Sequence, residues 1–321
     1  MTGDNGLRAI EHPGARQGIR RLRLPLGLAL VGVFSLVALV VLINDSRRLL
    51  DYSFHLDPLL VLLSFVIECS GLALAVPVWR QILARLGSRS SYRNDLRIYC
   101  YSMLGVILPG GFWPMVGRAA LYERQGISGL RVAAASIVEF VVVGLAGLLV
   151  YSLATLLDPT ESVWQRPVLA LAITVAALAL IHPPVFNRII RWLLQRSRRA
   201  VEPPVTLRYA ELGRWVALEG LVLGIGGTAV YVLLRSLAAV PPSLFVPVVG
   251  AWAAAAVAGN LFFWMPGTPV VRDGAMALVL TQSLPLSTSI LFVLLIRVWT
   301  IFSILAVAVL ARLLLARPLR R

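Results

Sequence analysis

The sequence predicts an all-α, polytopic integral membrane protein of about eight transmembrane helices, with one or two re-entrant or broken helices among them. Three observations lead to this prediction. Of the 321 residues, 59% are hydrophobic and 14% are charged, whereas about 25% of a soluble domain is charged. Several apolar stretches are long enough to cross a hydrocarbon core about 30 Å thick. Two shorter ones are interrupted by Pro-Gly, which is typical of transport-type sites within a membrane.

The continuous apolar stretches are the predicted spans, because about twenty apolar residues cross a bilayer as a helix. In chain order they are Leu24–Ile43, Pro58–Trp79, Val132–Leu157, Pro167–His182, Trp215–Leu234, Leu244–Met265 and Thr288–Leu310. No small-residue cleavage pattern follows the first of them, so we expect it to remain as an anchor. The membrane domain is predicted over 24–315, between a basic tail 1–23 and a short basic tail 316–321.

The arginines are distributed unevenly among the predicted loops, and the chain has no lysine. The tail 1–23 carries five arginines and the loop 188–214 carries seven. The alternate loops carry only Arg47, Arg48, Arg166 and Arg235. Because basic residues are in excess on the cytoplasmic side, both termini are predicted in the cytoplasm, with the protein in the cell inner membrane. The segment 266–286 is then expected to supply an eighth crossing, and 97–117 a re-entrant hairpin dipping from the cytoplasmic face.

The segment 185–200 has an amphipathic pattern of its own. Phe186, Ile189, Ile190 and Leu193 share one helical face, while arginines dominate the rest. A basic amphipathic helix of this kind lies in the headgroup plane and favours anionic lipid. The alternative is a solvated cytoplasmic linker.

The two interrupted stretches are the most informative part of the sequence. Neither apolar piece can cross the hydrocarbon core as a helix. Broken backbone at membrane depth is tolerated only where protein or a water-filled cavity satisfies its polar groups. The residues predicted as hinges of the broken helices are Pro109, Gly110 and Gly111 in the first stretch and Pro266 and Gly267 in the second. The pair predicts a polar binding site inside the membrane.

Ionisable side chains at predicted membrane depth support that site. Each costs about 2.5–3.5 kcal/mol to insert at mid-membrane unless it is paired, protonated or facing water. The residues expected to bind an anionic headgroup are Arg118, Arg272 and Arg297, because the guanidinium fork suits phosphate. The residues expected to balance these charges or carry protons are Glu139, Asp273, Glu68 and Glu219. The alternative is that buried ion pairs, such as Glu139 with Arg297, only fix helix packing.

Other function classes find little support in the sequence. It contains no phosphate loop, dinucleotide fingerprint, nucleophile motif or metal-ligand spacing, so we expect no enzyme activity, catalytic residue, metal or cofactor. The net charge of +15 is carried by arginines that follow the positive-inside pattern, so nucleic acid is not an expected partner. Cys69 and Cys100 lie in apolar stretches and are expected as small core residues. Trp79, near a span end, is expected to be an interface anchor.

Two motifs resemble a known family. The first runs from Gly105 through Pro109-Gly110-Gly111 to Gly117-Arg118-Ala119-Ala120, and a helix with Glu139 follows. The second runs from Pro266-Gly267 to Arg272-Asp273-Gly274-Ala275, and Arg297 follows in the last predicted span. Over roughly 24–315, the chain resembles the transmembrane region of lysylphosphatidylglycerol synthases, whose stand-alone members are called flippase-like proteins.

The resemblance implies a membrane domain that moves or handles lipids. It also implies functional roles, by position, for Arg118, Arg272, Asp273, Glu139 and Arg297. The chain continues only a few residues past its last predicted span, so we expect no aminoacyl-transferase domain and no synthesis of lysylphosphatidylglycerol by this chain. Three neighbours depart from the family pattern. No acidic residue immediately precedes Arg118, Asp273 stands where the family has Glu, and Phe140 follows Glu139 where Arg is frequent.

We therefore expect translocation of an anionic phospholipid or lipid-linked precursor across the inner membrane. One alternative is an intramembrane enzyme acting on a lipid head, with Glu139 or Asp273 as general base. The other is a non-catalytic membrane partner of a lipid- or glycan-modifying enzyme. Product analysis separates the first alternative from translocation, and co-purification of an enzyme would favour the second.

Overall fold

The computed structural model describes residues 56–157 and 207–315 except Pro109 and Pro266, together with the isolated positions 36, 40, 43, 44, 168, 172, 175 and 188. Within these residues the chain forms helices and turns and no strand. Apart from the isolated positions, the predicted spans Leu24–Ile43 and Pro167–His182, the amphipathic segment 185–200 and both tails lie outside the described residues.

The long helices confirm an all-α polytopic membrane protein. They are α3 (Pro58–Arg85), α6 (Gly129–Leu157), α9 (Tyr209–Leu237), α10 (Phe245–Leu261) with the short helix η2 (Pro242–Leu244) before it, and α12 (Leu286–Leu315). Each of these five is long and apolar enough to cross a membrane. The boundaries differ most at α3, which ends at Arg85 rather than Trp79, and at α9, which begins at Tyr209 rather than Trp215. Helix α10 ends at Leu261 rather than Met265, because residues 262–265 turn back toward the next helix.

The starts of α3 and α9 are fixed by side chains that satisfy the first free N–H groups. Asp57 Oδ1 accepts hydrogen bonds from the N–H groups of Leu59 (2.9 Å) and Leu60 (3.3 Å), and Pro58 occupies the first turn of α3. At the start of α9, the N–H of Arg208 donates to Glu211 Oε2 over 3.2 Å. Both arrangements are N-terminal caps, which explains why each helix begins at the residue it does.

Helices α3 and α9 lie side by side and run antiparallel. At one end the N–H of Asp57 donates to the carbonyl of Ser236 over 2.9 Å, and at the other end Arg85 forms an ion pair with Glu211. Between them, Ser64 Oγ donates to the carbonyl of Ala229 over 2.7 Å. This orientation defines two opposite ends of the bundle, one at the end of α3 and one at the end of α9.

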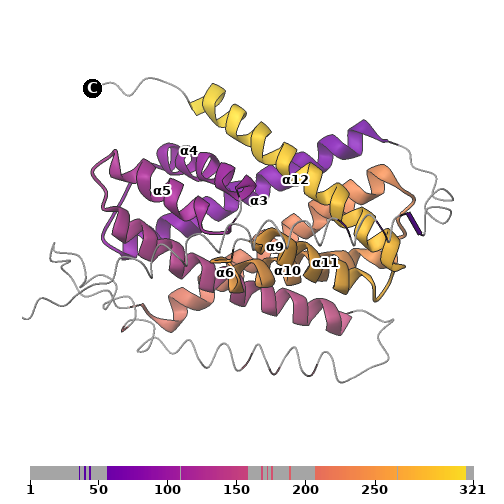
Figure 1. The fold of residues 1–321 in the computed structure, drawn as a ribbon. Coiled ribbons are helices and arrows are strands. Elements are labelled where there is room, and N and C mark those ends of the chain that lie inside the picture. Colours follow the sequence, from indigo (N-terminus) through magenta and orange to yellow (C-terminus); the bar gives the residue numbers. More distant parts are fainter. Residues whose placement is uncertain are drawn as a thin grey trace, which may run out of the picture.

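Two helical hairpins enter the bundle from these opposite ends. The first consists of α4 (Tyr92–Met103), the short helix η1 (Leu104–Ile107) and α5 (Trp113–Glu123), and it connects the end of α3 to α6. The second consists of α10 and α11 (Thr268–Leu280), and it connects the end of α9 to α12. Figure 1 shows α4 and α5 together at one end of the bundle and α11 toward the other.

The second hairpin corrects the expected eighth crossing. Helix α11 has 13 residues and rises about 20 Å, which is less than the hydrocarbon thickness of about 30 Å. It packs against α10, and a Cβ placed on Gly259 of α10 would lie 3.8 Å from Arg272 Cδ of α11. Because only a short turn joins the two helices, they run antiparallel. The segment 266–286 is therefore the returning half of a hairpin rather than an independent span.

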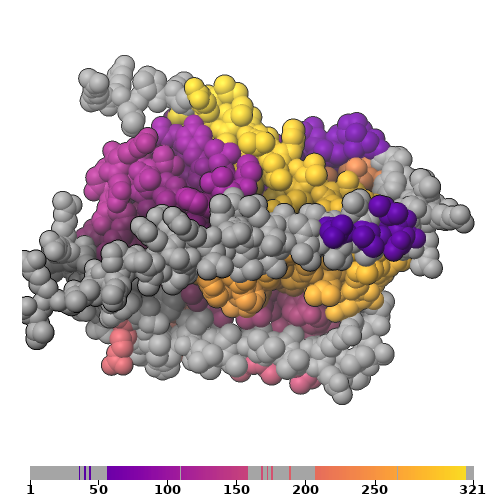
Figure 2. Space-filling view, viewed as in Figure 1, coloured from indigo at the N-terminus to yellow at the C-terminus, as the bar shows by residue number. Residues whose placement is uncertain are grey.

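The outer surface of α12 is apolar along one stripe. Val298, Phe302, Leu305 and Val309 are exposed at helical spacing, whereas Trp299, on another face, is buried. Figure 2 shows α12 lying on the surface beside α4 and α5. A continuous apolar stripe of this kind suits contact with lipid chains.

Candidate functional site

The tips of the two hairpins meet inside the bundle. At the tip of the first, Gly110 has a φ of +104°, a conformation that favours glycine. A Cβ placed on Gly111 would lie 3.0 Å from Phe263 Cα and 3.1 Å from the Phe263 carbonyl oxygen, so a larger residue would force the two tips apart by a few tenths of an ångström. The second tip is held by Thr268, whose hydroxyl lies 2.6 Å from the carbonyl oxygens of Phe262 and Met265. The predicted hinges Pro109 and Pro266 lie outside the described residues.

The base of the first hairpin is tied to α3 by a hydrogen-bond network. Arg80 Nε donates to Asp95 Oδ2 over 2.9 Å. The hydroxyl of Tyr122 donates to Asp95 Oδ1 over 2.6 Å and accepts a bond from Trp79 Nε1 over 2.9 Å. Trp79 is fully buried, so the expectation that it anchors the protein at the membrane interface is wrong. Its ring lies inside the bundle because the first hairpin covers the face of α3 that carries Trp79.

The first predicted arginine, Arg118, is enclosed and fully engaged. Its Nη1 donates to Glu139 Oε2 over 2.5 Å and its Nε to Ser102 Oγ over 3.3 Å. Its guanidinium carbon lies 4.1 Å from the ring centre of Trp79 and 4.3 Å from that of Tyr99. The hydroxyl of Tyr99 donates to Glu139 Oε1 over 3.1 Å. The two charges therefore have protein partners of opposite charge or polar character, which a buried pair requires.

The other two predicted arginines lie at the second hairpin and α12. Arg297 Nη1 on α12 donates to Asp273 Oδ2 on α11 over 2.7 Å. Glu139 thus pairs with Arg118 and not with Arg297, the pairing named as an example above. Arg272 lies beside this pair, and its guanidinium carbon is 4.7 Å from the ring centre of Trp252. No carboxylate among the described residues lies within 4.0 Å of Arg272 in an ion pair.

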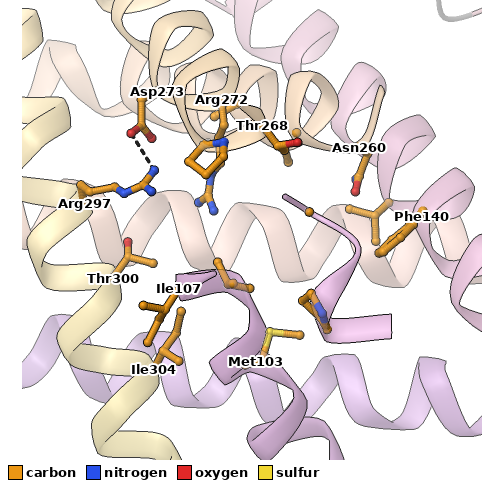
Figure 3. Close-up of a pocket in the computed structure, with 18 of the residues that line it drawn as sticks. Met103, Ile107, Phe140, Asn260, Thr268, Arg272, Asp273, Arg297, Thr300 and Ile304 are labelled. Atoms are coloured by element: carbon orange, nitrogen blue, oxygen red, sulfur yellow. Dashed lines mark hydrogen bonds and ion pairs between the residues drawn. The ribbon is translucent and has the colours of Figure 1, made fainter. Parts of the chain in front are cut away.

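A cavity of about 330 Å³ lies between the hairpins, α6 and α12. Most of its wall is apolar, with Met103, Ile107 and Ile304 among the lining residues (Figure 3). The charged and polar side chains that line it include Arg118, Glu139, Asn260, Thr268, Arg272, Asp273, Arg297 and Thr300. Figure 3 shows Arg272 pointing into the cavity, beside the Asp273–Arg297 pair. The five charged residues from the two family-like motifs therefore meet in one cavity.

The remaining predicted acids lie outside the cavity wall. Glu68 on α3 is half-buried and within electrostatic reach of Arg272. Glu219 on α9 is 3% exposed, and its Oε1 is buried without a hydrogen-bond partner among the described residues. Of the cysteines, Cys100 is buried and Cys69 half-buried, and both are free thiols. In the described part of the chain, no three acidic, histidine or cysteine side chains are grouped to hold a metal.

Several residues of the site were not predicted from the sequence. Trp252 and Tyr99 stack on arginines, and Thr300 adds a hydroxyl to the cavity wall. Thr300 lies three residues after Arg297, so the two share a face of α12. From this spacing, Thr300 could have been predicted to lie in the site. The tryptophan and tyrosine carry no comparable signal, because aromatic residues are frequent throughout membrane helices.

Comparison with known proteins adds one match to this geometry. The family of the lysylphosphatidylglycerol synthase TM region matches residues 24–308. The chain belongs to this family. The match covers both hairpins and all of the cavity, so the lysylphosphatidylglycerol synthase TM region is the unit that builds the site, and a membrane lipid-related role is consistent with it. No curated protein matches the chain.

Proposed function

We propose that this protein translocates an anionic lipid across the cell inner membrane, with the headgroup passing through the cavity between the two hairpins. The observation that carries the proposal is Arg272. It points into the cavity and has no ion-pair partner among the described residues. Arg272 is half-buried. A guanidinium at membrane depth without a carboxylate is costly, and a phosphate group supplies the matching anion with two parallel hydrogen bonds.

The cavity's size and lining support a headgroup as the occupant. A volume of about 330 Å³ corresponds to about eleven water molecules at roughly 30 Å³ each. That space holds a phosphate-bearing headgroup, while acyl chains stay in the surrounding lipid. The guanidinium of Arg297 and the hydroxyl of Thr300 face the same space and extend the donor set beyond Arg272.

The opposed hairpins support movement of the headgroup between leaflets. One hairpin enters from each end of the bundle, and their tips meet at Gly111 and Phe263. Each interrupted segment brings its own arginine, Arg118 or Arg272, to the shared cavity. Paired interrupted helices around a midplane site are the arrangement that alternating-access transporters use. With both termini in the cytoplasm, as the arginine distribution predicts, the first hairpin faces the cytoplasm.

The proposal assigns no catalytic residue, metal or cofactor to this chain. The sequence left two alternatives to translocation: the protein is a lipid-modifying enzyme, or it is a membrane partner of such an enzyme. Analysis of lipids by mass spectrometry after incubation with the purified protein distinguishes them, because translocation redistributes a lipid without changing its mass.

The test is a leaflet-exchange assay in proteoliposomes of phosphatidylcholine with trace fluorescent phosphatidylglycerol. Arg272→Ala is expected to lower the exchange rate at least tenfold, since a charge-assisted hydrogen bond contributes about 1.5–3 kcal/mol and each 1.4 kcal/mol is a factor of ten. Arg312→Ala is the matched control, because Arg312 is exposed near the end of α12. Equal rates for wild type and Arg272→Ala would refute the assigned role.

A further inference from the structure

We infer that Glu219 is a proton-binding site behind the cavity wall, and that binding of an anionic headgroup in the cavity is linked to uptake of a proton at this carboxyl group. The inference rests on the proposed function and adds to it the ion that accompanies the lipid. The sequence analysis expected four acidic residues to balance charge or carry protons, and this inference assigns the proton to Glu219 alone. It also leaves Glu139 and Asp273 with the structural task of pairing arginines.

The position of Glu219 is the first argument. It lies one turn before Leu223 on α9, and Leu223 lines the cavity. The side chain is 3% exposed, and its Oε1 has no hydrogen-bond partner among the described residues. A buried carboxylate in this situation costs so much free energy that a proton neutralises it.

The groups that face Glu219 give the second argument. Glu139 from α6, Arg118 from α5 and Tyr99 from α4 are within electrostatic reach of it. Arg118 already donates to Glu139 over 2.5 Å, and the Tyr99 hydroxyl donates to the same carboxylate over 3.1 Å. Glu68 on α3 is coupled to Arg272 instead. Ionised Glu219 would therefore face a like charge, with the nearest cation already paired.

The charge of the cavity gives the third argument. Three guanidinium groups line it, from Arg118, Arg272 and Arg297, against the two carboxylates of Glu139 and Asp273. That balance leaves one positive charge. An ionised Glu219 behind the wall cancels it, whereas a protonated Glu219 leaves the cavity attractive to an anion. Protonation of Glu219 thus makes the surroundings of the cavity more positive by one charge and favours an anion there.

The sign of the linkage follows from reciprocity between two bound ligands. An anion favours the protonated form of Glu219, and the protonated form favours the anion. Affinity for the headgroup is therefore highest at low pH and falls as the pH rises through the titration of Glu219. For a single linked proton, the decrease approaches tenfold per pH unit.

The experiment measures proton uptake and lipid binding with the full chain in detergent micelles. Fluorescent phosphatidylglycerol is added in weakly buffered solution with a pH-sensitive dye, at several starting values between pH 5 and 9. Wild type is expected to take up close to one proton per bound lipid over part of this range, with affinity that falls at higher pH. Glu219→Gln, which is neutral and similar in shape, is expected to bind at every pH without proton uptake.

Two further variants keep the test sharp. Glu219→Asp retains a titratable group and should retain proton uptake. Glu68→Gln removes the other acid outside the cavity wall and should still take up close to one proton per bound lipid, whatever its effect on affinity. Proton uptake that survives in Glu219→Gln, or that is lost in Glu68→Gln instead, overturns the inference, as does binding by wild type that never takes up a proton. Absence of lipid binding by wild type at every pH overturns the proposed function itself.

Discussion

The two hairpins bring arginines to the same cavity but treat them in opposite ways. In the first, the Arg118 and Glu139 side chains are 3% and 4% exposed, and aromatic rings cover the guanidinium. At the second, Asp273 of α11 pairs with Arg297 of the neighbouring α12, and their side chains are 15% and 32% exposed. Arg272 has no ion-pair partner among the described residues. The difference shows that a buried charge can serve either packing or binding, and that its partners decide which.

The reason lies in what surrounds each arginine. Arg118 on α5 lies against Trp79 of α3, Tyr99 of α4 and Glu139 of α6, so its charge must be satisfied within the protein. Arg272 and Arg297 lie where α11 meets α12, beside open volume. The first hairpin therefore provides a rigid wall, and α11 of the second hairpin and α12 provide the more exposed donors. Four substitutions test whether the first hairpin is structural and the second site binds ligand. Their expected effects on stability decrease from Arg118→Ala to Arg297→Ala.

Removal of Arg118 tests whether the first pair is structural. Arg118→Ala leaves Glu139 buried without its cation, and breaking such a pair costs about 3–5 kcal/mol. We expect a large loss of folded protein, measured as thermal unfolding in detergent. The double variant Arg118→Met with Glu139→Leu removes both charges and should recover most of the stability. A stable Arg118→Ala protein would mean that the first hairpin resembles the second.

Substitution of Gly111 tests the contact between the hairpin tips. The Cβ of Gly111→Ala would lie 3.0 Å from Phe263 Cα, and backbone atoms yield little, so overpacking should cost about 1–3 kcal/mol. Gly274→Ala is the control, because a Cβ there meets no atom within 4 Å. We expect the unfolding midpoint to drop for Gly111→Ala only. Equal midpoints for the two variants would indicate that the tips do not touch.

Loss of one hydroxyl tests the base of the first hairpin. Tyr122→Phe removes a donor to Asp95 and the acceptor for Trp79 Nε1. Hydrogen bonds of this kind contribute about 1 kcal/mol each, so we expect a measurable but modest decrease in the denaturation midpoint. Tyr101→Phe, at a half-buried position on α4, serves for comparison. A Tyr122→Phe protein as stable as wild type would show that the network adds no rigidity.

The smallest effect on stability is expected at the second pair. Because the Arg297 side chain is about one-third exposed, the free energy of unfolding should change by only about 0–1 kcal/mol in Arg297→Ala. Leaflet exchange of fluorescent phosphatidylglycerol should nevertheless slow, since a cavity donor is lost. An unfolding cost as large as that of Arg118→Ala, with exchange unchanged, would reverse the roles of the two hairpins.

Much of this arrangement could be anticipated from residue patterns. The long apolar stretches gave five helices near their expected positions, and the Pro-Gly breaks marked both hairpin tips. The five charged residues of the two motifs line one cavity. Ion-pair partners could not be read in this way, because Arg118 and Glu139 are 21 residues apart and their contact depends on how α5 lies against α6.

The chain alone determined the helical membrane class, the two interruptions and the identity of the charged residues, because hydrophobic length and Pro-Gly breaks act locally along the backbone. Only the tertiary structure decided which charge is satisfied and which faces open volume. Pairing, stacking on Trp79 or Trp252, and the isolation of Glu219 all depend on helices distant in sequence packing side by side. In a medium without water, those neighbours fix the free energy of each buried charge.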